Sequence, residues 1–512
     1  MKTYIGVDIG TTCTKALLYD ENGQVLHSAS FGYPLYSPTP AVAEQNPEEI
    51  FTAVVKTLKS VISLEKYDVS TLQFVSFSAA MHSVIAIDEK GQPLTNSITW
   101  ADSRATKFAE KIKSDWNGKK IYMRTGTPIH PMSPLAKITW LRHEKEEIFN
   151  ATAKFIGIKE YVFHKLFGRY IVDHSIASAT GLFNLTTNDW DEEALAVAGI
   201  TTTQLSELVP TTTVVTDMLP AMYEKIGFPA DVRFIIGAND GVLSNLGVNA
   251  IDPGVVAVTI GTSGAIRTVS DKPVTDPKGR IFCYVLTDKH WVIGGPVNNG
   301  GMTFRWVRDE LAASEVETAK RLGIDSYEIL TKIAERVAPG AEGLLFHPYL
   351  AGERAPLWNA NARGSFFGLG LHHKREHMIR AVLEGVIFNL YTVLLALEEL
   401  IGIPQKIQAT GGFAKSALWR QMMADIFNQT VTVPESHESS CLGAVVLGLY
   451  ATGEIEDFSI VSKWVGGTHH HEPIPENTKI YNELTPIFIR LSRMFNEEYE
   501  SIVEFQNKWV KK

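Results

Sequence analysis

The sequence has few cysteines and no arrangement of them that favours a covalent or metal framework. Cys13, Cys283 and Cys441 are the only three among 512 residues, and no two of them form a Cys-X-X-Cys pair. An odd number at wide spacing predicts neither a disulfide scaffold nor a zinc site. This cysteine usage favours a reducing, cytoplasmic environment.

Long apolar runs and an excess of positive charge are also missing. No uninterrupted apolar run reaches about 18 residues, the length that spans a bilayer. The N-terminus lacks the basic segment and apolar core of a signal peptide. Lysine and arginine total 48 against 57 acidic residues, giving a net charge of −9. This balance argues against nucleic acid or an anionic membrane as the main partner and predicts a soluble intracellular protein.

The size and composition predict two folded domains. Apolar residues make up 45% of the chain and charged residues 21%, as in ordinary globular proteins. A chain of 512 residues exceeds the size at which a single core usually stops growing. The turn Asp252-Pro253-Gly254 suits a boundary, so the predicted domains are residues 1–250 and 251–512.

The tripeptide Ile-Gly-Thr occurs twice, at 9–11 and 260–262, about half a chain length apart. Each copy follows one apolar strand pattern and leads into another, which indicates an internal duplication. A glycine followed by hydroxyl side chains lets a turn approach phosphate closely. For either copy alone, an ordinary hairpin turn is the alternative. As a pair, the two turns predict a clamp for one polyphosphate.

Charged side chains flank the first of these turns. Asp8 lies just before it and Lys15 just after it. A carboxylate in this place can face magnesium, and a lysine can meet phosphate. The polyphosphate site predicted from these residues contains Asp8, Thr11, Thr12, Lys15 and Thr262.

Strands alternate with helices along both halves, which is an α/β pattern. Polar or unusual residues gather where the predicted strands end. Strands are expected within 3–35 and at 72–78, 234–236, 255–260, 265–269, 406–410 and 430–433, and helices at 46–64, 377–401, 416–428, 440–452 and 486–506.

Asp240 is the candidate general base. It follows an apolar strand and precedes a glycine and a helix, so its carboxylate is expected at a carboxyl strand end, where α/β proteins bind ligands. Phosphoryl transfer to a sugar hydroxyl needs such a carboxylate. The alternative is a structural role for Asp240 as N-cap of a helix over 242–249.

Further candidates for a substrate site follow other predicted strands. Tryptophan can stack on a carbon chain, whereas aspartate, arginine and histidine can bind hydroxyls and a carboxylate. The structural alternatives are that His82 is an ordinary core histidine, that Arg104 forms a surface ion pair with Asp102, and that Trp100 is an ordinary core residue. The predicted substrate residues are Met81, His82, Trp100, Asp102, Arg104 and His130, together with Asp240.

Three other patterns carry weaker signals. Gly411-Gly412, after a strand and before a helix, suits close approach of a nucleoside, although a plain loop is the alternative. The run 469–471 consists of three histidines, for which a solvated loop is favoured over a metal site. Glu353-Arg354 is expected to form an internal ion pair or to support a loop rather than to act in catalysis.

Two segments resemble signatures of the FGGY carbohydrate kinases, part of the actin-like ATPase superfamily. MSPLAKITWL (132–141) resembles the first signature and GSFFGLGLHHKREHMIRAVLE (364–384) the second, although His143 departs from the first pattern's polar choice. The resemblance covers essentially the whole chain. It implies two ribonuclease-H-like domains with a central cleft that closes on ATP, magnesium and sugar.

Carried over by motif, the resemblance assigns roles to individual residues. Asp240 becomes the general base and the segment 8–15 the first phosphate turn. The second turn is then Gly261, Thr262 and Ser263, and the adenosine side is Gly301, Arg305, Gly411, Gly412 and Ser416. The family also implies a possible homodimer.

The substrate segments differ from two well-known branches of the family. Xylulose kinases have Gln-Met-His-Gly and glycerol kinases Gln-Arg-Glu-Thr where this chain has Ala80-Met81-His82-Ser83. SFSAAMHSVIAID, TWADSR and RTGTPIHPMSPL are instead similar to segments of gluconate kinases. That similarity implies phosphorylation of D-gluconate at the 6-position, with Arg104, His130 or Lys137 near its carboxylate. For Lys137, a structural role is the alternative. A xylulose or other pentulose kinase, and a non-catalytic actin-like sugar sensor, are the alternatives.

Overall fold

The computed structural model describes residues 2–65, 67–434, 439–466 and 468–509. Two compact units make up the chain. The N-terminal unit contains residues 1–253, 269–293 and 438–466, and the C-terminal unit contains 254–268, 294–437 and 467–512. The predicted domain division between residues 250 and 251 stays a prediction.

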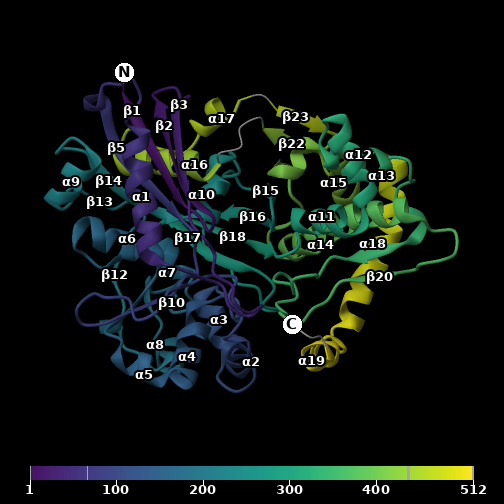
Figure 1. The fold of residues 1–512 in the computed structure, drawn as a ribbon, viewed down its shortest axis with the longest axis horizontal. Helices are drawn as coiled ribbons and strands as arrows, with labels where there is room; N and C mark the ends of the chain where they lie inside the picture. The colour runs from purple at the N-terminus through teal and green to yellow at the C-terminus, as the bar shows by residue number, and fades with distance from the viewer. Residues whose placement is uncertain (1, 66, 435–438, 467, 510–512) are drawn as a thin grey trace. The chain divides into compact units, whose positions relative to one another are not determined.

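The N-terminal unit is built on a six-stranded sheet in the order β13-β14-β5-β1-β2-β3 (Figure 1). The strand β1 pairs antiparallel with β2 and parallel with β5, and β5 pairs parallel with β14. Three strands are therefore formed within 3–35, as predicted. The strands are β1 (Thr3–Ile9), β2 (Cys13–Asp20), β3 (Val25–Gly32), β5 (Leu72–Ala79), β13 (Val214–Val215) and β14 (Arg233–Asn239).

Helices cover both faces of this sheet. The helix α1 (Pro47–Val61) begins after its N-cap Asn46 and buries its apolar side in one core with Ile5 and Val7 of β1. Tyr4, on the opposite face of β1, packs in a second core with α10 (Asp240–Gly247) and α16 (Ser439–Ala451). Alternate residues of a strand face opposite sides, so β1 supplies both cores.

The helices α10 and α16 approach each other at backbone distance. A Cβ on Gly443 would lie 2.0 Å from the carbonyl oxygen of Leu243, so a larger residue cannot occupy this position without moving α10. Because Asp240 begins α10, this close contact fixes the helix on which the candidate base lies.

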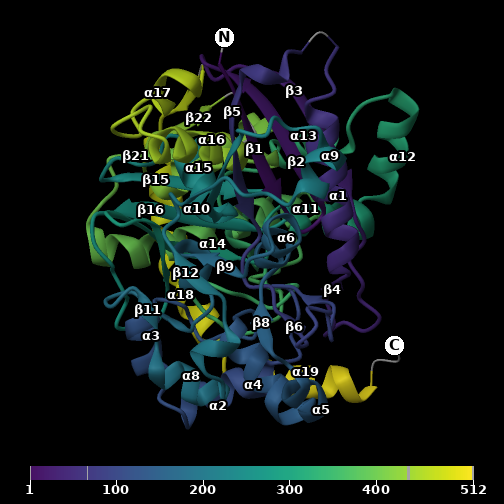
Figure 2. The same cartoon turned by 90° about the vertical axis from the view of Figure 1, so that its left-hand side faces the viewer.

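Smaller helices gather at one end of the N-terminal unit around a core of their own (Figure 2). The residues Leu135, Ile138 and Trp140 of α4 belong to this core. The helices are α2 (Thr106–Ser114), α3 (Gly118–Thr125), α4 (Pro134–Glu144), α5 (Glu146–Ala151) and α8 (Glu192–Ala198). The other helices of this unit include α6 (Ile158–Phe167), α7 (His174–Ser178) and α9 (Pro220–Ile226).

A seven-stranded sheet has the order β17-β18-β16-β15-β21-β22-β23. Its strand β15 pairs antiparallel with β16 and parallel with β21, the same relations that β1 has with β2 and β5. The two Ile-Gly-Thr turns therefore occupy equivalent places in two similar sheets. The strands are β15 (Val255–Ile260), β16 (Gly264–Ser270), β17 (Phe282–Thr287), β18 (His290–Val297), β21 (Lys406–Thr410), β22 (Val431–Pro434) and β23 (Thr468–His471).

The long helix α14 (Arg375–Ile401) is apolar enough by length and composition to cross a membrane. However, 78% of its most apolar 18-residue window is buried in the structure, as expected of a core helix. In the C-terminal unit it is accompanied by α11 (Gly301–Trp306), α12 (Ala313–Leu322), α13 (Ser326–Ala334) and α15 (Ala417–Phe427). The short helix α17 (Val461–Trp464) belongs to the N-terminal unit, where Val461 packs in the core of α10 and α16.

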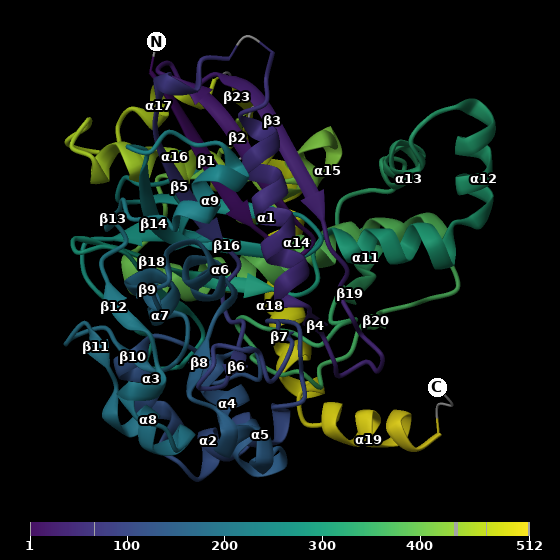
Figure 3. The ribbon, with the colours of Figure 1, turned by 60° about the vertical axis from the view of Figure 1, so that its left-hand side comes forward.

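Two predicted elements are wrong. The single helix expected at 486–506 is instead two helices, α18 (Pro475–Phe495) and α19 (Tyr499–Trp509), and α19 extends away from the foot of α18 (Figure 3). Pro486 lies inside α18, where buried Tyr481 and Phe488 outweigh the proline's preference for a helix start. The histidines 469–471 form an edge strand paired with β22, not a loop.

The remaining strands are short. They are β4 (Glu44–Gln45), β6 (Ile85–Ile87), β7 (Ser97–Ile98), β8 (Lys154–Ile156), β9 (Ile171–Asp173), β10 (Phe183–Asn184), β11 (Asp189–Trp190), β12 (Glu207–Val209), β19 (Leu345–His347) and β20 (Ser365–Phe367).

Candidate active site

The first Gly-Thr turn, between β1 and β2, is held by side chains from three distant segments. The hydroxyl of Tyr33 donates to the carbonyl of Gly10 at 2.6 Å, and Nε2 of Gln45 donates to the carbonyl of Thr11 at 2.6 Å. Nε1 of Trp100 donates to the Thr11 hydroxyl oxygen at 3.0 Å. Trp100, predicted as a substrate residue, is thus joined to the phosphate turn. Tyr33 and Gln45 were not predicted, because no local pattern marks them.

Asp8, the predicted magnesium-facing carboxylate, is partly exposed near the end of β1. The hydroxyl of Ser78, opposite it on β5, donates to Oδ1 at 2.7 Å. Lys15 lies opposite Asp8 on β2, on the other side. This cross-strand pairing places the predicted cation and carboxylate side by side at the base of the turn.

Asp240 is partly exposed and is the first residue of α10, but it does not cap that helix. The N-cap is Asn239, whose Oδ1 accepts the N–H of Val242 at 2.9 Å. The alternative reading of Asp240 as N-cap is therefore wrong. Oδ1 of Asp240 accepts the N–H of Gly241 at 2.7 Å, within the positive end of the helix dipole.

A buried polar network holds Asn239. Its side-chain Nδ2 donates to the hydroxyl oxygen of Ser175 at 2.9 Å, and its backbone N–H donates to the same oxygen at 3.2 Å. Beside it, Lys159 Nζ lies 2.8 Å from Asp173, the N-cap of α7, and donates to the Ala238 carbonyl at 3.4 Å. The end of β14 is thus fixed by α6 and α7.

Parallel pairing brings Asp8 and Asp240 to one edge of the sheet. The strands β1, β5 and β14 are adjacent and parallel, with Asp8 opposite Ser78 and Asn239 opposite Ala79. Carboxyl ends of parallel strands are the usual place for ligands in α/β proteins. The N-terminal unit therefore combines the first Gly-Thr turn with two carboxylates.

The second Gly-Thr turn is joined to the start of α11. The N–H of Gly301 donates to the carbonyl of Gly261 at 2.7 Å, and the N–H of Met302 donates to that of Thr262 at 3.0 Å. A Cβ on Gly301 would lie 2.7 Å from the Gly261 oxygen, so this contact requires glycine. Ser263 closes the turn by accepting the Gly261 N–H at 2.9 Å.

A pocket of about 720 Å³ opens beside this turn within the C-terminal unit. Aromatic side chains of Phe304, Tyr327 and Trp419 line it together with charged residues, including Glu328 and Lys332. Apolar walls with a few polar groups are typical of a site for a flat heteroaromatic ligand. Six predicted nucleotide residues line it: Gly261, Thr262, Gly301, Arg305, Gly412 and Ser416.

Two of the predicted nucleotide residues also have structural roles. Gly411 has a φ of +104°, and a Cβ there would lie 2.3 Å from the carbonyl oxygen of Ile260. Ser416 is the N-cap of α15 and accepts the N–H of Trp419 at 3.2 Å. The glycine brings β21 against the second turn, and the serine starts the helix that carries Trp419.

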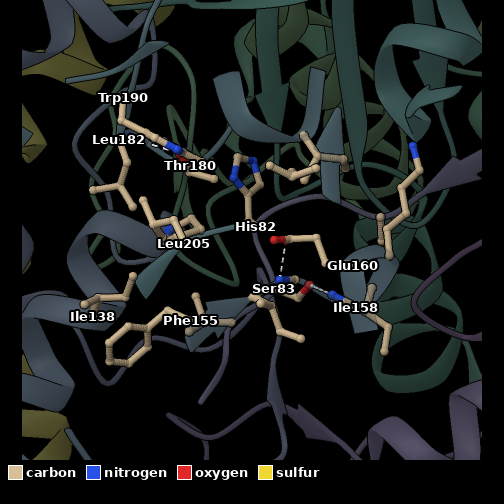
Figure 4. A pocket seen from close by; sticks show the side chains of 18 residues that line it. His82, Ser83, Ile138, Phe155, Ile158, Glu160, Thr180, Leu182, Trp190 and Leu205 are labelled. Atoms are coloured by element: carbon tan, nitrogen blue, oxygen red, sulfur yellow. Dashed lines mark hydrogen bonds between the residues drawn. The ribbon is translucent and has the colours of Figure 1, made fainter. Parts of the chain in front are cut away.

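The predicted sugar residue His82 is buried and lines a cavity of about 30 Å³, shown in Figure 4 with Ser83 and Glu160 close by. Its Nδ1 lies 2.7 Å from the carbonyl of Ala179, which places the proton of a neutral ring on Nδ1. The neighbouring Met81 is half-buried against the core formed by α10 and α16. His82 is thus a firmly oriented histidine.

Arg104 does not form the surface pair considered above. Asp102 is only 2% exposed and accepts the N–H of Ala43 at 3.0 Å as well as Arg104 Nε. Glu44 also binds the Arg104 guanidinium, which lies 4.6 Å from the ring centroid of Trp140. The Arg104 guanidinium is therefore paired with two carboxylates, those of Asp102 and Glu44.

Glu353 and the histidines 469–471 lie in contrasting surroundings. Glu353 is fully buried and accepts from Asn298 N–H at 2.5 Å and from the side chains of Asn299 and Asn389 at 2.9 and 2.8 Å. It supports a loop, as predicted. Among the residues that the structure describes, no three histidines, cysteines or carboxylates are placed to hold a metal ion, which includes 469–471.

Comparisons with known proteins agree with this geometry. The family model "FGGY family of carbohydrate kinases, N-terminal domain" matches residues 3–247, and the corresponding C-terminal domain model matches residues 256–452. The Gluconokinase of Bacillus subtilis (strain 168) is 61% identical over 503 residues, which cover 98% of each chain.

Two solved structures from Lactobacillus acidophilus are also similar. A gluconate kinase superposes with a TM-score of 0.91 at 38% identity, covering 98% of this chain and 99% of the other. A ligand-bound xylulose kinase superposes with a TM-score of 0.92, also at 38% identity, covering 98% and 100%. The predicted fold of two α/β sugar-kinase domains is thereby confirmed.

Proposed function

The chain belongs to the FGGY family of carbohydrate kinases, which use ATP, and from this premise we propose that it transfers the γ-phosphoryl group of ATP to D-gluconate. The product is 6-phospho-D-gluconate. The observation that carries the choice of substrate is the 61% identity to a gluconokinase across 98% of both chains. His82 and His130 in the N-terminal unit are proposed to bind this sugar acid.

One observation favours a second candidate. The xylulose kinase from Lactobacillus acidophilus matches this chain with the same 38% identity as the gluconate kinase from that organism. Fold similarity at that level does not separate the two substrates. Xylulose or another pentulose is therefore the alternative substrate.

Asp240 is proposed as the general base for the 6-hydroxyl of the sugar acid. A carboxylate that accepts this proton makes the oxygen a better nucleophile toward the γ-phosphorus. Two observations support the role. Asp240 is partly exposed at the carboxyl end of a strand, and the N-cap of α10 is Asn239, so the Asp240 carboxylate is not used as the cap. The buried contacts of Asn239 would keep the carboxylate in place during turnover.

The two Gly-Thr turns are proposed to bind the phosphates, and the 720 Å³ pocket to bind adenosine. Backbone N–H groups and threonine hydroxyls suit phosphate oxygens. Arg305 is exposed on α11 and adds positive charge at this pocket. Phe304 and Trp419 offer apolar surface for the base.

Magnesium fits the residues at the first turn. The ion is usually held in kinases by one or two carboxylates together with phosphate oxygens and water, and Asp8 supplies one such carboxylate. When bound, it neutralises charge on the β- and γ-phosphates. Ser78, which donates to Asp8, would orient the carboxylate. A cytoplasmic location and a homodimer also stay predictions.

The test is ADP release with magnesium-ATP and a panel of D-gluconate, D-xylulose, D-ribulose, glycerol and D-glucose, with mass spectrometry of the products. We expect selective turnover of gluconate. Greater turnover of xylulose would replace the proposed substrate by the alternative. No turnover of any sugar would favour the non-catalytic sugar sensor and overturn the proposal.

A further inference from the structure

His82 has a backbone conformation that few residues other than glycine adopt. Its φ is +70°, in the left-handed region that side chains with a Cβ rarely adopt. Such a residue persists only where its surroundings hold it in place. Since His82 is only 6% exposed, those surroundings are the buried groups that contact its backbone and ring.

One of those groups is the ammonium of Lys137, on α4. Its Nζ donates to the carbonyl oxygen of His82 at 2.6 Å and to the carbonyl oxygen of Met132 at 2.8 Å. The two carbonyls are 50 residues apart in sequence and belong to the two loops that carry the proposed sugar-binding histidines. We call Lys137 with these two carbonyls the Lys137 clamp.

The clamp reaches His130 through Met132. The backbone N–H of Met132 donates to Nδ1 of His130 at 3.2 Å. A neutral histidine that accepts at Nδ1 carries its proton on Nε2. The orientation and tautomer of His130 therefore depend on a segment that Lys137 holds from its other side.

The position of Lys137 is costly, which argues against an incidental contact. Its side chain is fully buried, and burial lowers its pKa to about 7, with Asp102 opposing and Arg104 adding to this effect. Its Nζ donates to the backbone carbonyls of His82 and Met132 and not to a carboxylate. Lys159, the other fully buried lysine of this region, is instead paired with Asp173 at 2.8 Å.

We propose that Lys137 is a positioning residue for the sugar acid, holding the loops of His82 and His130 in the arrangement that binds it. The inference rests on the proposed function of these two histidines. It also reassigns Lys137 from a direct partner of the substrate carboxylate to a residue that acts through others. Substrate recognition would then depend on a buried charge in contact with backbone oxygens.

The experiment compares Lys137→Met with the wild-type enzyme by steady-state kinetics. Methionine has similar length but no donor, so both carbonyls lose their partner. We expect KM for gluconate to rise by about ten-fold or more, as for a lost charge-assisted hydrogen bond, while KM for ATP changes by less than about two-fold. If Lys137→Met does not fold, Lys137→Gln, which keeps a neutral donor, takes its place.

Lys154→Met is the matched control. Lys154 Nζ also donates to two backbone carbonyls, those of Thr203 at 3.1 Å and Leu205 at 2.9 Å, but in a loop that carries no proposed site residue. If the loss of any lysine that bridges two backbone carbonyls raised KM for gluconate, both variants would show the rise. The proposal requires a rise in KM for gluconate in Lys137→Met alone.

A double-mutant cycle with His82→Gly tests the route of the effect, because glycine adopts a positive φ without cost. We expect Lys137→Met to raise KM less in the His82→Gly background than in the wild type. Equal rises in the two backgrounds, or parallel rises in KM for gluconate and ATP, would overturn the proposal. Should the wild type turn over only a pentulose, the proposed substrate fails, but KM for that pentulose still tests the clamp.

Discussion

Trp100 Nε1 donates a hydrogen bond to the Thr11 hydroxyl oxygen at 3.0 Å, joining segments 89 residues apart. Thr11 belongs to the first Gly-Thr turn, and Trp100 begins the segment that contains Asp102 and Arg104. A single contact thus connects the proposed phosphate site with one of the proposed sugar loops, and both lie in the N-terminal unit.

Replacing Trp100 by phenylalanine keeps an aromatic ring but removes the donor. A neutral hydrogen bond is worth about 1 kcal/mol, so we expect kcat/KM to fall by about five-fold. Steady-state kinetics at saturating ATP measure this. Trp116→Phe is the control, since Trp116 stacks on His143 and lies away from the turn. Equal losses in the two variants would assign the effect to ring size alone.

Replacing Asp240 by asparagine removes the proposed base while keeping the shape of the side chain. We expect ATP binding, measured by calorimetry, to stay within about two-fold, and kcat to fall by about 10²- to 10⁴-fold. Asp231→Asn, at an exposed turn residue before β14, is the matched control. Turnover near the wild-type rate in Asp240→Asn would remove the assignment.

Replacing Asn239 by alanine removes both the cap of α10 and the contact with Ser175. A lost N-cap costs about 1 kcal/mol of stability, which urea unfolding measures. Asn46→Ala is the control because Asn46 caps α1 in the same way, accepting the N–H of Glu48 at 2.9 Å. We expect the larger stability loss for Asn239→Ala, which also loses its buried contact with Ser175. A fall in kcat of about ten-fold or more is expected only for Asn239→Ala, since only Asn239 precedes the proposed base. Equal kcat values in the two variants would contradict this.

Stability is expected to depend on the protonation of Glu160. Burial raises the pKa of this carboxyl from 4.5 to about 7, although it accepts the N–H of Gly157 at 2.5 Å. The folded state therefore holds a proton that the unfolded chain releases above pH 4.5. The resulting stabilisation is complete below that pH and is lost as the pH rises through about 7.

Urea unfolding of the wild type and Glu160→Gln at pH 5 and pH 8 measures this effect. Glutamine cannot ionise, so the wild type should lose about 2 kcal/mol more than Glu160→Gln over this range. Exposed Glu207 provides the control variant Glu207→Gln. The same pH dependence in the wild type and Glu160→Gln would show that another group is responsible.

Much of the fold could be predicted because its signals are local. The repeated Ile-Gly-Thr turns, the strand patterns around them and the helix over 377–401 all depend on neighbours in sequence. Asp240 could be placed at a strand end for the same reason. The sequence could not show that Asn239, and not Asp240, is the N-cap of α10. Both residue types are good N-caps, and only the backbone conformation decides between them.

The errors have a common physical cause. The histidines 469–471 have no strong strand pattern, yet they pair with β22 because that edge of the sheet offers hydrogen bonds to an added strand. Pro486 is a helix-start signal that the packing of α18 overrides. Local preference is worth about 1 to 3 kcal/mol, which tertiary packing can exceed.

The sequence by itself determined the α/β class, the duplication, the two Gly-Thr turns and the residue types available for the proposed phosphoryl transfer, since each depends on residues close together in the chain. Only the tertiary structure decided which distant side chains hold them: Tyr33, Gln45 and Trp100 on the first turn, and Lys137 on the histidine loops. Hydrogen bonds between segments tens of residues apart depend on how the chain folds back, and no local pattern encodes that.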